Sequence, residues 1–435
     1  MKTTSPFTRR DMLKVSGMAG LATMAGITPT VKGETQQRRP RIACLASYWG
    51  ATRSHADWIM VKLIDGYWWQ GAHTESRVDV ASIYIHQHET SELGRKVGET
   101  SGIPVYRSVE EALTLGTDEL AVDGVVIIGE HGDYPKDLKG HWLLPRWQIY
   151  NQVVQVFEQS NRSVPVFNDK HLSYTWDESK WMFDKSRELN FPLTGGSSIP
   201  LYYRTPEIEL DIDTPIKNSI SIGGTSDEGA IFHVVDTLQA FVERRRGGET
   251  GVRSVQSIRG PETWNWVDQH PWAGELLSSV ERRFEFEPGH FRQVDQTNMC
   301  HIVYNDDTQA AVIGGRGVDW TYAGEIEGQQ DATVISLYGM LPSPYDQYHA
   351  SNALPHWITE MMVTKEEPFN AERLLLSSGI VNHYMESNWE NGRYSPVGRR
   401  LETPFLDMTY QTTRGAQFNT GERPPNRPYI RGFSE

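Results

Sequence analysis

Short apolar runs alternate with stretches of helical spacing through the first half of this 435-residue chain, and this alternation restricts its fold more than any other feature. The sequence predicts strands at residues 41–46, 78–85, 124–128, 164–167 and 191–194. It predicts helices between them at residues 58–64, 110–115 and 147–158. A repeated strand–helix order gives a parallel sheet with helices on both faces. We therefore predict an α/β, Rossmann-like domain over residues 39–199.

The pattern changes after residue 200. One helix is expected at 229–243, and strands at 298–304 and 309–314 are separated by the turn residues Asn305, Asp306 and Asp307. Strands joined by a tight turn pair in an antiparallel manner. We therefore predict an α+β domain with a largely antiparallel sheet over residues 200–400, followed by a C-terminal tail over 401–435.

The first 35 residues predict an export signal. Arg9 and Arg10 stand directly before a weakly apolar, Gly/Ala-rich stretch at 15–31, which is the order of a twin-arginine signal peptide. We expect the twin-arginine translocation machinery as a partner, a periplasmic location, and no membrane span after processing, because no apolar run is long enough. The net charge of -14 makes a nucleic acid a poor partner.

Polar, ionisable side chains follow four of the predicted strands. Ligands in an open α/β sheet gather at the carboxyl ends of the strands, so these turns predict a single site for a small molecule. The residues expected there are His55, His86, His88, Glu130, His131, Asp169, Lys170 and His171.

Three segments in serial order resemble the glucose-fructose oxidoreductase / inositol dehydrogenase (Gfo/Idh/MocA) family. They are residues 102–113, 122–128 and 164–170, and Asp169-Lys170-His171 stands where the family has Glu-Lys-Pro. His233 and Asp236 on a predicted helix resemble the family's His-x-x-Asp, and residues 372–395 resemble its last helix and strand. The resemblance covers roughly residues 39–400.

This resemblance implies NAD or NADP as cofactor, a sugar or cyclitol as substrate, and a homo-oligomer assembled through the second-domain sheet. It implies that Lys170 orients the substrate and that His233, with Asp236 beside it, is the acid/base. Oxidation of an alcohol needs a base for the hydroxyl proton and a cation for the forming oxyanion. The residues expected to contact the substrate are Glu130, His131, Asp169 and His171.

The sequence departs from the family at cofactor positions. The loop after the first strand keeps one glycine, Gly50, where Gly-x-Gly-x-x-Gly is expected, and Tyr48 and Trp49 are bulky. His86 replaces the acidic residue after the second strand, and Gly229 stands where the family usually has Asp. A bound dinucleotide would be held by Ser47, Arg53, Ser54 and His86.

Two other functions remain open at this point. One is a cofactor-free lyase or hydrolase acting on a carbohydrate, in which a divalent metal acts as Lewis acid. Its candidate ligands are His55, His86, His88, Glu130 and His131. The other is a non-catalytic carbohydrate-binding protein, since aromatic clusters at 67–69 and 264–266 are of the kind that stacks on sugars.

Overall fold

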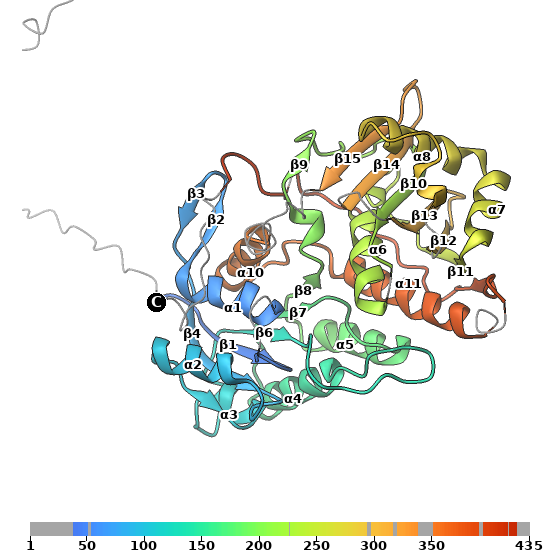
Figure 1. The fold of residues 1–435 in the computed structure, drawn as a ribbon. Coiled ribbons are helices and arrows are strands. Elements are labelled where there is room, and N and C mark those ends of the chain that lie inside the picture. Colours follow the sequence, from blue (N-terminus) through green and yellow to red (C-terminus); the bar gives the residue numbers. More distant parts are fainter. Residues whose placement is uncertain are drawn as a thin grey trace, which may run out of the picture. The chain divides into compact units, whose positions relative to one another are not determined.

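The computed structural model contains the parallel sheet that the sequence predicts (Figure 1). It describes residues 38–50, 54–225, 227–293, 297–315, 320–337, 351–390, 395–415 and 417–423, so the predicted signal peptide and Arg53 lie outside the described residues. Residues from 39 onward belong to one compact unit. The strands are β1 (Arg41–Ala46), β4 (Asp79–Ile85), β5 (Val105–Tyr106), β6 (Gly124–Ile128), β7 (Val166–Asp169) and β8 (Leu193–Gly196). Their order is β5-β4-β1-β6-β7-β8, so the direction of winding reverses between β1 and β6.

Helices cover both faces of this sheet because its strands carry apolar side chains on both faces. Ala43 and Leu45 of β1 pack with α3 and α4, whereas Ile42 and Cys44 pack with α1, α2 and α10. The helices are α1 (His55–Asp65), α2 (Glu92–Ser101), α3 (Val109–Thr114), α4 (Arg146–Gln159), α5 (Trp176–Glu188) and α10 (Ala353–Thr364). Burial on both faces is the arrangement that near-continuous apolar strands favour.

Helix α10 falls within the sequence range predicted for the second domain, yet it packs on the first sheet. Ile358, Met361 and Met362 lie in the same core as Ile59 and Met60 of α1. The predicted boundaries at 199 and 400 remain a prediction.

The second sheet is largely antiparallel, as predicted, with one parallel pair between β10 and β13. Its order is β16-β11-β12-β13-β10-β14-β15-β9. The strands are β9 (Arg204–Thr205), β10 (Ile216–Gly223), β11 (Val252–Arg259), β12 (Asn298–Tyr304), β13 (Gln309–Gly314), β14 (Trp320–Ile326), β15 (Thr333–Leu337) and β16 (Leu401–Glu402). Helices α6 (Glu228–Val242) and α11 (Ala371–Glu390) cover one face, and α7 (Pro261–Gln269) and α8 (Pro271–Arg283) cover the other.

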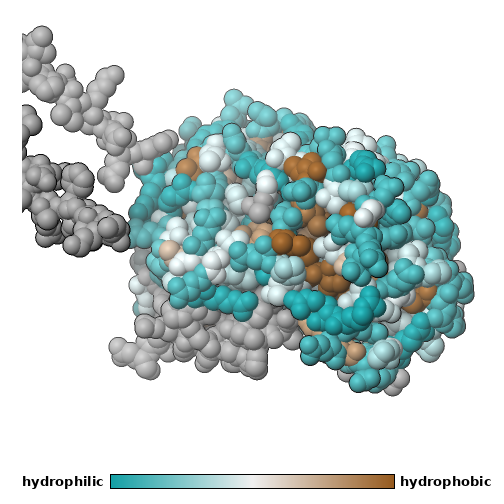
Figure 2. All heavy atoms as spheres, turned by 90° about the horizontal axis from the view of Figure 1, so that it is seen from above, coloured by the Kyte–Doolittle hydropathy of each residue, from teal (hydrophilic) through white to brown (hydrophobic). Residues whose placement is uncertain are grey.

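A small hairpin of β2 (Tyr67–Trp69) and β3 (Ala72–Thr74) stands apart from both sheets. Hydrophilic residues cover most of the face shown in Figure 2, with a band of hydrophobic residues near its middle. Within the described part of the chain, no helix combines the length and the apolar character needed to span a membrane.

Candidate functional site

Lys170 and Glu130 meet at the carboxyl ends of β7 and β6. The Lys170 ammonium donates to Glu130 Oε1 at 3.0 Å, and Arg146 at the start of α4 donates to Glu130 Oε2 at 2.6 Å. All three side chains are buried. Lys170 has a left-handed backbone, φ +59°, and its N–H donates to the Gly196 carbonyl, which fixes the turn that aims the side chain.

The carboxylate of Glu130 stays ionised in this buried position. Burial alone would raise its pKa, but the charges of Lys170 and Arg146 hold the pKa well below its usual range. The result is a fixed negative charge between two cations.

His55 and Asp169 form a second pair beside the first. Ser54 caps α1 by accepting the Asp57 N–H, which makes His55 the first residue of the helix. His55 Nδ1 lies 2.7 Å from Asp169 Oδ2, and both residues are buried. The carboxylate orients the imidazole.

Three histidine rings gather at this point. The ring of His55 lies 5.4 Å from that of His131 and 5.9 Å from that of His233, measured between centroids. Burial and the neighbouring His55 lower the pKa of His131 to about 4. Burial and Lys170 lower the pKa of His233 well below its usual value, so both rings are neutral at pH 7.

His233 is held by a serine that the sequence analysis missed. Ser197, which follows β8, places its hydroxyl oxygen 2.6 Å from His233 Nδ1. The Ser197 N–H donates to Asp236 Oδ2 at 2.8 Å, and Ser377 donates to Asp236 Oδ1 at 3.2 Å. Asp236 therefore stands behind Ser197 and positions it, and the hydrogen bonds found here do not support the direct catalytic role that was expected.

A polar turn directly after a predicted strand was the signal for the other site residues. The same signal at Gly195-Gly196-Ser197-Ser198 would have found Ser197.

His171 points into a buried network behind the site. Arg146 donates to His171 Nε2 at 3.0 Å, and the same nitrogen lies 3.4 Å from Glu228 Oε1. Glu228 is also 2.6 Å from His141 Nδ1. Burial and Arg146 lower the pKa of His171. This network fixes Arg146, so the structure gives His171 a supporting place in contrast to the substrate contact expected of it.

His86 and His88 do not join the cluster. His86 Nδ1 lies 2.8 Å from the Tyr134 hydroxyl, and His88 lies beside Glu89 at 3.4 Å. Among the residues that the structure describes, no group of three or more His, Cys, Asp or Glu side chains is placed to hold a metal ion. The metal alternative therefore has no support.

Two tryptophans flank the histidines. Trp58 of α1 lies 5.5 Å from the ring of His55, and Trp320 of β14 lies 5.6 Å from the ring of His233. Neither was singled out in the sequence. Aromatic faces beside polar groups are a common arrangement for binding sugars.

The aromatic clusters that were singled out lie elsewhere. Trp69 stacks on His356 at 4.0 Å, and Trp266 stacks on His270 at 3.9 Å. These rings therefore give no support to a carbohydrate ligand at the strand ends.

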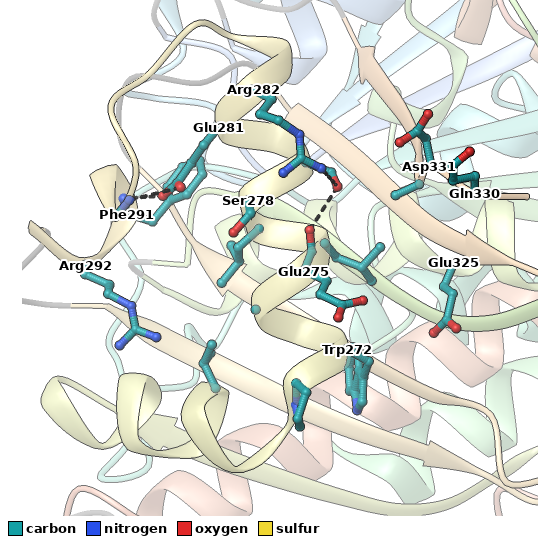
Figure 3. Close-up of a pocket in the computed structure, with 18 of the residues that line it drawn as sticks. Trp272, Glu275, Ser278, Glu281, Arg282, Phe291, Arg292, Glu325, Gln330 and Asp331 are labelled. Carbon is teal, nitrogen blue, oxygen red and sulfur yellow. Dashed lines mark hydrogen bonds between the residues drawn. The ribbon is translucent and has the colours of Figure 1, made fainter.

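A cavity of about 640 Å³ opens on the face of the second sheet that α7 and α8 cover, between α8 and the β14–β15 turn (Figure 3). Trp272, Glu275 and Glu325 are among its lining residues, and none of the predicted site residues reaches it. It is separate from the histidine cluster.

No family model and no curated protein matches this sequence. Solved structures do match. GenD2 from gentamicin A biosynthesis, in complex with NAD, aligns with a TM-score of 0.53 at 11% identity, covering 87% of this chain and 99% of that one. Myo-inositol 2-dehydrogenase from Lactobacillus plantarum aligns with a TM-score of 0.51 at 10% identity, covering 83% and 99%. The chain shares the two-domain fold of these solved structures. The expected fold class, a Rossmann-like parallel sheet followed by an α+β domain, is confirmed.

In an open, doubly wound α/β sheet, a dinucleotide would lie where the strand order reverses, here between β1 and β6. The Ser47 N–H continues the β1–β6 ladder by donating to the Ile128 carbonyl at 2.9 Å. Beyond the ladder, the Ser47 hydroxyl bridges the crevice by donating to the Glu130 carbonyl at 2.8 Å. The Tyr134 hydroxyl donates to the Ser47 carbonyl at 3.2 Å.

The next residues of the loop are also engaged. The Trp49 N–H donates to Ser91 Oγ at 2.9 Å, and its indole is fully buried beside Leu93 and Val97. A backbone closed by protein partners cannot approach a pyrophosphate, which needs free N–H groups and small residues. The described residues of this crevice do not fit a dinucleotide in the family's usual position.

Proposed function

We propose that this chain is an enzyme that acts by acid–base catalysis at a hydroxyl-bearing carbon of a carbohydrate. The observation that carries the proposal is the pair of oriented imidazoles, His233 on Ser197 and His55 on Asp169, whose rings lie 5.9 Å apart. Lys170 lies close enough to lower the pKa of His233. A binding protein has no need of such a convergence of ionisable groups.

His233 serves as the base. In the tautomer in which Nδ1 donates to Ser197, Nε2 is the nitrogen that takes a proton, and the low pKa keeps the ring neutral until substrate binds. The Lys170 ammonium stabilises the negative charge that develops on a substrate oxygen when His233 takes the proton. Glu130 keeps the ammonium in place.

Oxidation or reduction with NAD(P) is one form of this proposal. The NAD complex of GenD2 and the dehydrogenase name of the Lactobacillus plantarum protein support it at the level of the fold. A nicotinamide would supply the hydride acceptor. The bridge from Ser47 to Glu130 opposes this form.

A carbohydrate is the proposed substrate because Trp58 and Trp320 flank the imidazoles. Their ring faces would pack on the apolar face of a pyranose or cyclitol, while Lys170 and His233 engage its hydroxyls.

The test is a binding and turnover screen with a panel of aldoses, keto-sugars, uronic acids and inositols. We expect at least one member to bind to the wild-type protein, and His233→Ala and Lys170→Ala to lose turnover by at least 100-fold, in the range of general acid–base catalysis. His270→Ala is the matched control because His270 stacks on Trp266 away from the site. Equal turnover in His233→Ala, Lys170→Ala and the control would refute the assignment.

Export and assembly are further proposals. We propose twin-arginine export to the periplasm and a homo-oligomer, with cell fractionation and light scattering as the measurements. Replacing Arg9 and Arg10 by Lys should retain the protein in the cytoplasm.

A further inference from the structure

We infer that the crevice between β1 and β6 is closed to a dinucleotide and that the site of this chain works by proton transfer without a hydride acceptor. This inference rests on the proposed acid–base function and narrows it to redox-neutral chemistry. A dinucleotide would need room at the pyrophosphate position, at the ribose position and at the N-terminus of α1, and the described residues oppose it at each.

The pyrophosphate position is occupied on the β1 side. Tyr48 and Trp49 follow β1 directly, and a Cβ at Gly50 would lie 2.1 Å from the Tyr48 hydroxyl oxygen. The Trp49 carbonyl accepts the Gly94 N–H at 2.8 Å, which binds the loop to the start of α2. The glycine of this loop therefore makes room for Tyr48, a side chain of this chain itself.

The ribose position has the wrong chemistry. A carboxylate after the second strand of the motif normally accepts the ribose hydroxyls. Here His86 occupies that place, and it stacks on the ring of Tyr134 with 5.9 Å between centroids. Tyr134 in turn donates to the Ser47 carbonyl, so one aromatic side chain links the ends of β4 and β1.

The N-terminus of α1 faces a carboxylate. A helix N-terminus attracts the negative charge of a pyrophosphate. In this chain His55, the first residue of α1, is bonded to Asp169 across the end of the sheet at 2.7 Å. A pyrophosphate placed there would break this bond and bring its charge close to Asp169.

A reaction that needs no dinucleotide is an elimination, in which one histidine takes a proton from the substrate and another gives a proton to the leaving oxygen. In an elimination from a carbonyl-bearing sugar, His233 takes the proton from the carbon next to the carbonyl, and the electron pair of that C–H bond forms a C=C bond. The neighbouring C–O bond breaks, and the leaving oxygen takes a proton from His55, whose ring Asp169 orients. No electrons leave the substrate, so no oxidant is needed.

The test uses the mature, natively exported protein. It is denatured, the released small molecules are analysed by mass spectrometry, and the folded protein is separately titrated with NAD⁺, NADH, NADP⁺ and NADPH in a calorimeter. We expect no nicotinamide in the released fraction and no saturable heat at millimolar concentration. NAD(P) near one per chain, or saturable binding of any of the four, would overturn the inference.

Two controls separate this inference from the proposed function. His233→Ala loses turnover on the carbohydrate panel whether or not a dinucleotide binds, so it reports on the acid–base site alone. For any carbohydrate that is converted, product mass distinguishes the reactions: an oxidation removes two hydrogens, whereas an elimination removes water. A product lacking two hydrogens would overturn the redox-neutral inference while leaving the acid–base site standing.

Discussion

Gly229 leaves the space that the Lys170 ammonium occupies. A Cβ at Gly229 would lie 3.0 Å from Lys170 Nζ and 3.5 Å from Glu130 Oε1. Glu130, from a different part of the chain, supplies the carboxylate for the lysine.

Gly229→Ala should lower turnover while leaving the protein folded. The methyl group displaces the ammonium by a few tenths of an ångström, and we expect about 10-fold lower kcat because oxyanion stabilisation depends on position. Alanine in a helix contributes up to about 1 kcal/mol of stability relative to glycine, so the Tm should not fall. Gly274→Ala in α8 is the control, since its Cβ would meet only Val267 at 3.8 Å. Unchanged kcat in Gly229→Ala would show that the Lys170 position is not critical.

Glu130→Gln should destabilise the fold strongly. It leaves Lys170 and Arg146 buried without a counter-charge, which typically costs about 3–5 kcal/mol. Urea unfolding of Glu130→Gln, Lys170→Met and the double variant forms a double-mutant cycle. We expect the double variant to be more stable than Glu130→Gln alone. If the two single effects simply add, the pair is not coupled.

Stability should rise with pH between about 4 and 6.5. The pKa of His131 is about 4 in the folded chain against 6.5 for an ordinary histidine. Over this window the unfolded chain binds a proton that the folded chain does not, so raising the pH favours the folded state. His131→Gln should reduce the slope of unfolding free energy against pH by up to one proton. An unchanged slope would mean that His131 titrates normally.

Ser197→Ala should change the pH profile of activity more than stability. Without the Ser197 hydroxyl, the His233 ring loses the partner that fixes its orientation, and we expect kcat to fall about 10-fold with a shifted pH optimum. Ser221→Ala is the matched control, because Ser221 is also buried and its hydroxyl has no hydrogen-bond partner among the described residues. A shift of the pH optimum of equal size in both variants would show that the role of Ser197 is purely structural.

The first sheet was predictable because its strands are apolar on both faces. The expected strands at 41–46 and 124–128 match β1 and β6. The sequence predicted where the site lies, at the carboxyl ends of the strands, but not which side chains contact one another there. Arg146 and Glu228 are single charges directly before the predicted helices, and only the tertiary contacts to Glu130 and His171 bring them to the site. The tryptophan clusters at 67–69 and 264–266 lie away from the site, because adjacency in the sequence does not indicate which ring reaches a ligand.

Helix α10 bears on how the chain acquires its structure during synthesis. Residues 39–199 leave the ribosome long before Ala353–Thr364, yet Ile358 and Met362 complete the core that β1 and α1 share. Until α10 arrives, one apolar face of the nascent parallel sheet lacks part of its cover. Under the proposed export in the folded state, the chain would have to be translated almost to its end before it is competent to leave the cytoplasm.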